Sequence, residues 1–501
     1  MMWRFGLFDS TAFDSTFEPL VSTYWALCIA LALPLLLGLL AALFPPKRMW
    51  PVALASLPLL ASGLVLLFAF EQAGLLRWQW QIAGVSLSLR LNGLSVLLLL
   101  TTQWIGVAAA LYTPGVLRLG EPEPLSRWLW PLMGALLSAL SLIWLATDLL
   151  TLYIALELMG LAAVGMLLLS GKVAALLAGM RYLLLALVGS LAYLLGVALI
   201  LGHWGRLDLQ GLADVVEPGP VAWIAGALIG AGLALKAALF PLHGWLSPVH
   251  SNAWTPVSAL HAALVIKASL FMLLQLWSIL LPDTFYAPRV IAWLGVLAIV
   301  WGGFLAWRTD SLKILVASST VAQLGYLMVV FPLLLGPDIA PLSRALAWEG
   351  FWLQLMGHAF AKSAMFLAAG NLILATGQST IKGLAGTSRR LPLSLLVFGI
   401  ASVTLMGLPP SSGFTAKWLL LEAMLISQQW WAVAALLVGT LLTAAYVFRM
   451  FRYSFDESAP RHRYQPLAPG MDLIALTLAL IAFALGLLAH FPLELMHGGG
   501  V

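Results

Sequence analysis

Charged side chains are scarce in this sequence. They make up 9% of its 501 residues, whereas 62% of the residues are hydrophobic; in soluble domains roughly a quarter of the residues are charged. So few charges cannot cover the surface of a soluble protein, and the mean hydropathy of +0.99 indicates the same. The composition therefore predicts an all-α polytopic membrane protein with the lipid bilayer as its solvent. The small net charge of +5 gives no reason to expect a nucleic-acid partner.

Cysteine and the usual metal-ligand patterns are also lacking. The single cysteine, Cys28, excludes an intramolecular disulfide, and the sequence contains no CxxC motif. We therefore expect neither a metal site nor a bound cofactor. A basic N-terminal region is missing too, because Asp9, Asp14 and Glu18 stand there instead, so a cleavable signal peptide is not expected.

Long polar stretches are absent, and no segment is expected to fold as a separate soluble domain. The apolar runs instead predict about fourteen transmembrane helices, because about 20 helical residues cross a hydrocarbon core of ~30 Å. The runs cover residues 24–44, 52–70, 94–112, 128–146, 149–170, 174–203, 221–240, 257–281, 290–307, 312–335, 346–375, 393–426, 431–451 and 473–491. Between the second and third runs, residues 77–91 alternate polar and apolar side chains, which is typical of a short extracytoplasmic hairpin or an amphipathic piece.

The distribution of Lys and Arg predicts the orientation. If all fourteen runs cross, the basic residues divide roughly two to one between the two sides, and the richer side is expected to be cytoplasmic. The richer side has Lys47, Arg48, Arg118, Arg127, Lys172, Arg308, Lys313, Lys382, Arg389, Arg390, Arg452, Arg461 and Arg463, and the other has Arg4, Arg77, Arg90, Arg206, Arg289 and Arg344. The sequence thus predicts a multi-pass protein of the bacterial plasma membrane with both termini extracytoplasmic.

Several ionisable residues stand inside these apolar runs. They are Glu157, Lys236, His261, Lys267, His358, Lys362 and Lys417. A charge at the centre of a membrane helix costs about 2.5–3.5 kcal/mol on insertion scales. Any one of these residues could be a structural polar contact or could extend to an interface. One acid with several bases on so many helices instead indicates a proton path, because desolvated lysines and histidines can exchange protons.

Two of the predicted helices are also broken beside a lysine. Lys236 precedes Pro241, and Lys417 follows Pro409 and Pro410; proline removes a helical hydrogen bond and clashes with the preceding turn. Two such breaks about five helices apart predict two inverted five-helix repeats, each with a functional site at its broken helix. The expected units are residues 1–127 with helices 1–3, 128–281 with helices 4–8, 286–453 with helices 9–13, and 471–493 with helix 14.

Two further histidines follow the first break. His243 and His250 could lie near one interface and take up or relay protons at ordinary pH. Simple capping or surface placement explains them equally well.

The residues around these charges resemble a known family, the antiporter-like subunits of respiratory complex I and of Mrp-type multisubunit cation/proton antiporters. The resemblance covers roughly residues 90–450. It rests on LELMGLAAVGML, LKAALFPLHGWL followed by TPVSAL, LKILVASSTVAQLGYLMV, GHAFAKSAMFLAAGN and GLPPSSGFTAKW. It implies that Glu157 and Lys236 form a buried pair between helices five and seven. It further implies proton-translocating roles for Lys267, His358, Lys362 and Lys417.

Within the family the chain looks most like the D subunit of Mrp antiporters. The expected function is therefore that of a proton-translocating subunit of a Na⁺/H⁺ antiporter, working with other membrane subunits and with no catalysis of its own. Two alternatives use the same charges. One is a pump subunit of a redox complex, either an NADH:quinone oxidoreductase or a membrane-bound hydrogenase. The other is the energising membrane subunit of an inorganic-carbon uptake complex.

Overall fold

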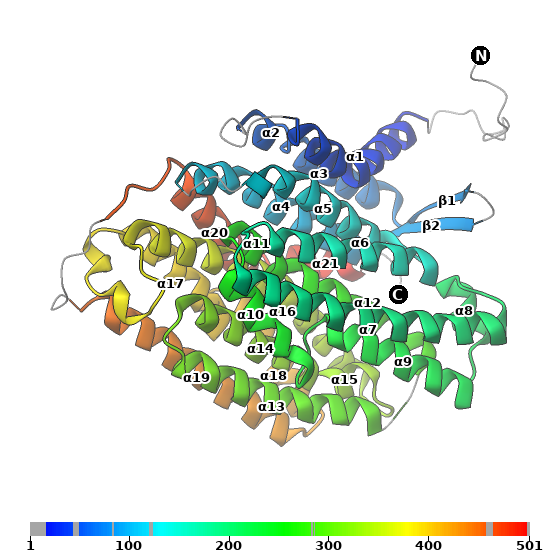
Figure 1. Cartoon of the computed structure of the whole chain (residues 1–501). Helices are drawn as coiled ribbons and strands as arrows, with labels where there is room; N and C mark the ends of the chain where they lie inside the picture. The colour runs from blue at the N-terminus through cyan, green and yellow to red at the C-terminus, as the bar shows by residue number, and fades with distance from the viewer. Residues whose placement is uncertain are drawn as a thin grey trace, which may run out of the picture.

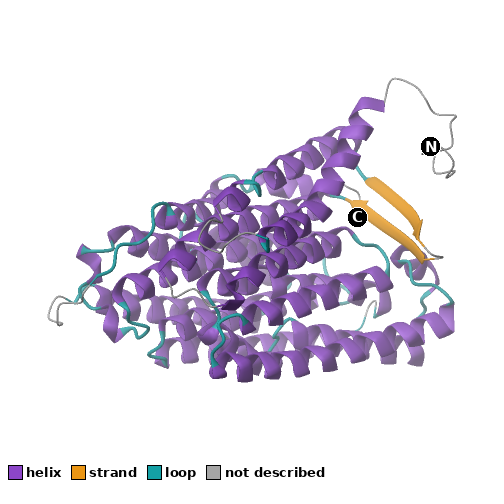
Figure 2. Ribbon diagram, turned by 45° about the horizontal axis from the view of Figure 1, so that its top comes forward, coloured by secondary structure: helices purple, strands orange, loops and turns teal. Residues whose placement is uncertain are grey.

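The protein is a bundle of long helices that run side by side (Figure 1). The computed structural model describes residues 17–43, 50–82, 85–119, 124–281, 284, 286–456 and 464–497. At one side of the bundle lie α1 (Phe17–Ala41), α2 (Trp50–Leu54) and α3 (Pro58–Ala73). A two-stranded antiparallel hairpin, β1 (Leu76–Ile82) and β2 (Val85–Leu91), projects from one end of the bundle (Figure 2). This confirms a hairpin within the alternating segment.

The first half of the remaining chain contains one broken helix. This half begins with α4 (Gly93–Leu119), α5 (Leu129–Leu145), α6 (Leu149–Leu168), α7 (Val173–Trp204) and the short α8 (Leu209–Val215). The broken helix comprises α9 (Pro220–Lys236), the 3-10 turn η3 (Leu242–Trp245) and α10 (Leu246–Asn252). The next membrane helix joins α11 (Thr255–Leu260), the π-helical turn η4 (His261–Val265) and α12 (Ile266–Leu280).

The second half of the remaining chain also contains a broken helix. It begins with α13 (Tyr286–Arg308), α14 (Leu312–Val329), α15 (Phe331–Leu335) and the 36-residue α16 (Pro341–Thr376). The second broken helix consists of α17 (Pro392–Met406) and α18 (Ser412–Ile426), after which come α19 (Trp430–Ser454), α20 (Met471–Leu487) and α21 (His490–His497). The division into two inverted repeats stays a prediction.

All fourteen predicted runs fall on helices. Eleven helices in the described residues are long and apolar enough to cross a membrane, or twelve if α20 and α21, which are bent by 71°, form one span. The apolar helices α9 and α17 are shorter, because a break follows each of them. The count of fourteen crossings therefore stays a prediction, as does the placement of the termini, which lie outside the described residues.

Burial divides the helices into a centre and a periphery. Within an apolar 18-residue stretch of each span, 100%, 94% and 89% of the residues are buried in Thr255–Leu280, Leu312–Leu335 and Pro341–Thr376, whereas 39% are buried in each of Val173–Trp204, Tyr286–Arg308 and Trp430–Ser454. The peripheral helices expose large apolar side chains, as expected of surfaces that face lipid. Four of the predicted site residues, His261, Lys267, His358 and Lys362, therefore lie on the most enclosed helices.

Candidate functional site

The first part of the candidate site is an ion pair between α6 and α9. Lys236 Nζ lies 2.6 Å from Glu157 Oε1, as the resemblance implies, and the Ser190 hydroxyl of α7 donates to the same carboxylate oxygen. The lysine side chain is 4% exposed and the glutamate side chain 23%. Gly189 and Gly232 allow this geometry, because a Cβ atom on either one would clash with the main chain of the other helix. Removing one partner of such a buried charge pair is strongly destabilising, because the other charge then remains buried without its partner.

The break after α9 lies directly beside this pair. Lys236 is the last residue of α9, and Ala238 has a φ of 53°. The carbonyl of Leu235 accepts from the indole of Trp245 at 3.0 Å and from the Ala238 N–H at 3.2 Å, which meets the requirement that irregular backbone at membrane depth be satisfied by the protein.

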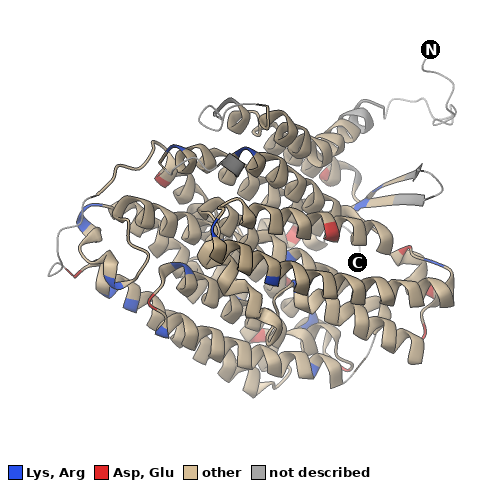
Figure 3. Cartoon of the chain, in the orientation of Figure 1, with Lys and Arg blue, Asp and Glu red and all other residues tan. Residues whose placement is uncertain are grey.

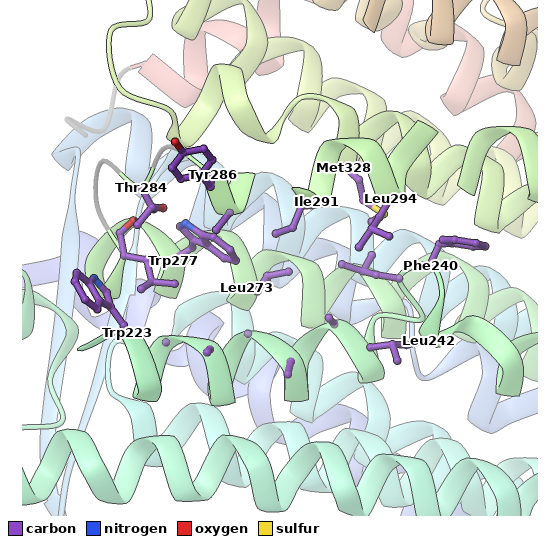
Figure 4. A pocket seen from close by; sticks show the side chains of 18 of the residues that line it. Trp223, Phe240, Leu242, Leu273, Trp277, Thr284, Tyr286, Ile291, Leu294 and Met328 are labelled. Carbon is purple, nitrogen blue, oxygen red and sulfur yellow. Dashed lines mark hydrogen bonds between the residues drawn. The ribbon is translucent and has the colours of Figure 1, made fainter. Parts of the chain in front are cut away.

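A cavity of about 570 Å³ lies on the outer side of the first break (Figure 4). Its walls are small residues of α9 and apolar side chains of α12 and α13, with Trp223, Thr284 and Tyr286 at one end and Phe240 and Leu242 at the other. None of the residues that line it is charged, so it is separate from the line of ionisable residues.

A π-helical turn places the second group of bases. Lys267 of α12 donates to the carbonyl of Ala262, five residues earlier, within the wider helical turn that starts at His261. Both ionisable side chains are 1% exposed. Single π-helical turns inside α-helices are frequent at functional sites, and this one orients the lysine toward a neutral oxygen.

The two histidines after the first break have different environments. His250 is fully buried, stacks on Phe366 with ring centroids 4.7 Å apart, and lies 6.4 Å from the ring of His261. Surface placement, considered for it from the sequence, is therefore wrong. His243 is half-buried and stacks on Phe240 at 5.3 Å.

The long central helix α16 carries the next two bases. Lys362 Nζ donates to the carbonyl of Val316 at 2.9 Å and to the hydroxyl of Ser319, both on α14. His358, one turn away, is 2% exposed, and neither of its ring nitrogens has a hydrogen-bond partner among the described residues. Lys267 is close enough to both for direct electrostatic interaction. The π-helical turn before Lys267 packs against α16, so the structure brings Lys267 close to the helix that carries His358 and Lys362.

Lys417 bridges the second break. Its Nζ donates to the carbonyls of Leu405 and Met406, each at 3.1 Å, and to the Thr440 hydroxyl of α19 at 3.2 Å. It also lies 4.4 Å from the centroid of the Tyr326 ring, a distance at which a cation is attracted by the ring face. The ammonium therefore satisfies the last carbonyls of α17, which the break leaves without helical partners.

Two glutamines extend the hydrogen bonds around Lys417 to α16. Gln323 Nε2 donates to the Leu405 carbonyl at 3.2 Å, so that one oxygen accepts from both Gln323 and Lys417. Gln354, one turn before His358 on α16, donates to Gln323 Oε1 at 2.9 Å. The sequence reasoning did not single out Gln323 or Gln354. The available signal was a polar amide within each of the apolar runs AQLGY and WLQLM.

A second polar group outside the predicted site fixes α20. Asp472 accepts from Asn371 of α16 at 2.8 Å and from Ser394 of α17 at 2.5 Å, and Tyr112 of α4 donates to Asn371 at 2.6 Å. This group ties the last long helix to the central one.

The hydrogen bonds that connect the buried ionisable residues are interrupted at two places. In the described part of the chain, no hydrogen bond or ion pair joins Lys236 to Lys267, and the two glutamines link Lys417 to Gln354 of α16 with no hydrogen bond onward to His358 or Lys362. The described residues also contain no group of three or more His, Cys, Asp or Glu side chains that could hold a metal ion.

Comparison with known proteins gives a consistent set of relatives. Residues 146–443 match the family described as NADH:quinone oxidoreductase/Mrp antiporter, TM. The chain is 31% identical over 446 residues to NADH-quinone oxidoreductase subunit N of Desulforudis audaxviator, covering 86% of each chain. It is 26% identical over 477 residues to the D subunit of the Na(+)/H(+) antiporter of Bacillus subtilis, covering 91% of this chain and 93% of the relative.

A solved structure has the same fold. A chain in the Mrp complex from Dietzia sp. DQ12-45-1b superposes with a TM-score of 0.83 at 23% identity, over 96% of this chain and 97% of that one.

Proposed function

Because this chain belongs to the family of membrane subunits shared by NADH:quinone oxidoreductases and Mrp antiporters, we propose that it conducts protons through the line Glu157, Lys236, Lys267, His358, Lys362 and Lys417. His261, His243 and His250 flank this line as relay or uptake groups. The observation that carries the proposal is the set of partners that these lysines have. Only Lys236 meets a carboxylate, whereas Lys267, Lys362 and Lys417 meet neutral carbonyls and hydroxyls. A neutral partner can hold the lysine in either protonation state.

Electrostatic repulsion between neighbouring bases moves the proton along this line. Two like charges roughly 7 Å apart repel by about 2 kcal/mol at an effective dielectric of about 20. Protonation of Lys267 therefore disfavours protonation of Lys362 and His358, with which it interacts directly. Lys417 forms the end of the line and passes charge to an outlet or to a partner subunit.

The assembly that we propose is a multisubunit Na⁺/H⁺ antiporter of the Mrp type. It is supported by the length match to the D subunit of the Bacillus subtilis antiporter and by the fold match to the Mrp complex. A pump subunit of a redox complex is the second candidate, favoured by the 31% identity to a quinone oxidoreductase subunit. Purifying the tagged chain from its own membranes and identifying the accompanying subunits separates the two.

Charge-preserving substitutions test the proton path. Arginine keeps its charge at any accessible pH and cannot release its proton. Lys236→Arg and Lys417→Arg should therefore assemble at wild-type levels and lower proton flux in membrane vesicles at least about tenfold, the factor that corresponds to about 1.4 kcal/mol.

The matched control is Lys172→Arg, because Lys172 is exposed and lies outside the line. It should leave flux unchanged. Wild-type flux in Lys417→Arg, with normal protein levels in the membrane, would show that Lys417 acts only as a fixed charge and would contradict the proposed relay.

A further inference from the structure

An open cavity of about 650 Å³ lies along the C-terminal part of α19, with Trp307 of α13 as one wall. It is lined by Trp307, Ala445, Phe448, Arg449, Phe451, Arg452, Tyr453 and Phe455, so two arginines and no acid line it. Several Lys and Arg positions lie at this end of the bundle, around the ends of α17 and α19 (Figure 3). Unlike the apolar cavity beside the first break, this cavity has charged side chains in its walls.

Arg449 is held rigidly at the base of this cavity. Its guanidinium donates to the carbonyls of Trp307 and Thr309, each at 2.6 Å, and pairs with Asp310 at 2.6 Å. These bonds satisfy carbonyls at the end of α13 that have no helical partner. The side chain is only 19% exposed, so its position is fixed before any ligand arrives.

Arg452 supplies the second, accessible guanidinium. It follows Arg449 by three residues on α19, so the two side chains share one face of the helix. Arg452 is exposed and makes no ion pair within the described ranges. Its planar fork is suited to binding two oxygens of one phosphate.

Exposed aromatic side chains surround these arginines. Trp307, Phe448 and Phe455 are 48%, 66% and 62% exposed on helices that face lipid. Farther along α19, Leu441 is 70% exposed and continues the apolar surface toward the membrane centre. Tryptophan is enriched at the level of lipid headgroups, and Phe448 and Leu441 extend an apolar surface from the arginines, so a charged site and an apolar surface meet at one place.

We propose that this cavity binds the phosphate headgroup of an anionic phospholipid, with the acyl chains lying along α19. The cavity and the surface beside it match the two parts of such a molecule, whereas an acidic protein segment would use the arginines and leave the apolar surface uncovered. Basic pockets between membrane helices on the cytoplasmic side are suited to anionic lipids. The site is independent of the proposed proton path, because none of its lining residues belongs to that line.

Lipid retention by the purified full chain tests the proposal. The protein, in neutral detergent with its accompanying subunits, is mixed with phosphatidylglycerol or phosphatidylcholine, and bound lipid is counted by native mass spectrometry. Arg452→Gln should lower phosphatidylglycerol retention about fivefold, as expected for one basic residue at a membrane surface, and should leave phosphatidylcholine retention unchanged. Arg452→Lys should retain an intermediate amount, because it keeps the charge and loses the planar fork.

Arg308→Gln is the matched control. Arg308 is exposed at the same end of α13 and does not line the cavity, so the same charge change there should alter retention less than twofold. Equal losses in Arg308→Gln and Arg452→Gln, or no loss in Arg452→Gln, would overturn the site. Displacement of the lipid by glycerol phosphate at equal concentration would show that the headgroup anion alone is bound, and would overturn the lipid assignment. Melting temperatures of all variants verify that they are folded.

Discussion

At the scale of single residues, the buried lysines differ in what surrounds their ammonium groups. Lys236 has a carboxylate partner, while Lys417 has two carbonyls, a hydroxyl and an aromatic ring. An ion pair favours the charged lysine strongly, whereas neutral acceptors favour it less. Proton release should therefore be easier at Lys417, which suits a position at the end of a relay.

The glutamine pair yields a prediction at this scale. Gln323→Leu removes the hydrogen bonds to Gln354 and to the Leu405 carbonyl, and should cut proton flux in vesicles at least about tenfold by interrupting the polar connection between α16 and Lys417. It should also lower unfolding free energy by about 1–3 kcal/mol, because the amide of Gln354 is left without its acceptor.

The control for this prediction is Gln103→Leu. Gln103 is likewise buried and donates a single bond, to Ser62 at 3.3 Å, on α4 away from the line. It should lose stability without losing flux. Equal flux in the two variants would mean that Gln323 has a structural role only.

The ionisable members of the site could be predicted from the sequence, but most of their partners could not. A charge inside an apolar run is visible by itself, and the resemblance pairs Glu157 with Lys236. Ser190, Ser319 and Gln323 became recognisable only when helices far apart in sequence were seen in contact. Hydroxyls and amides are common enough in membrane helices that their presence alone does not indicate a site.

At the scale of elements, the second break depends on one glycine. Gly407 ends α17 with a φ of 77°, and a Cβ atom there would lie 2.7 Å from Lys417 Cδ. Gly407→Ala should therefore both strain the backbone, at about 1–2 kcal/mol for a left-handed conformation, and displace the lysine from its carbonyls. We expect a lower melting temperature together with a loss of proton flux.

Gly377→Ala separates these two effects. Gly377 ends α16 with a φ of 69° and has nothing within 4 Å of a new Cβ atom. It should show a similar drop in melting temperature with flux retained. If Gly377→Ala loses flux as well, the effect at Gly407 comes from instability and not from Lys417.

The sequence predicted where the helices break but not how each break is built. Proline identifies both positions, since it cannot continue a helix. The sequence also places Lys236 before the first break and Lys417 after the second, but only the structure shows that Lys417 reaches back across its break to the carbonyl of Leu405, whereas Lys236 pairs with Glu157. The π-helical turn at His261 has no proline or glycine within it, so no local signal announced it.

At the scale of the whole molecule, the enclosed helices form an ionisable centre within an apolar shell. The most enclosed span, which joins α11, η4 and α12, packs against the central helix α16 through α11 and η4, while α7, α13 and α19 face outward. The apolar shell isolates the line from lipid and confines its exits to the ends of the bundle or to neighbouring subunits.

Orientation is the prediction that belongs to this scale. An enzyme reporter fused after Val501 should be active when it needs the extracytoplasmic side and silent when it needs the cytoplasm, because the basic loops are expected inside. A fusion after Lys172, on the side rich in basic residues, should give the reverse pattern. Cytoplasmic activity at Val501 would mean an odd number of crossings or an inverted orientation.

The oxygen shared by Gln323 and Lys417 belongs to the main chain of Leu405. Every amino acid at position 405 would supply the same atom, so no codon change can delete it. Because the Leu405 side chain is buried, mutational screens should find only apolar replacements of similar size harmless there. Substitutions can change the donors and the break that exposes the oxygen, but they cannot remove the acceptor, because it is a main-chain atom.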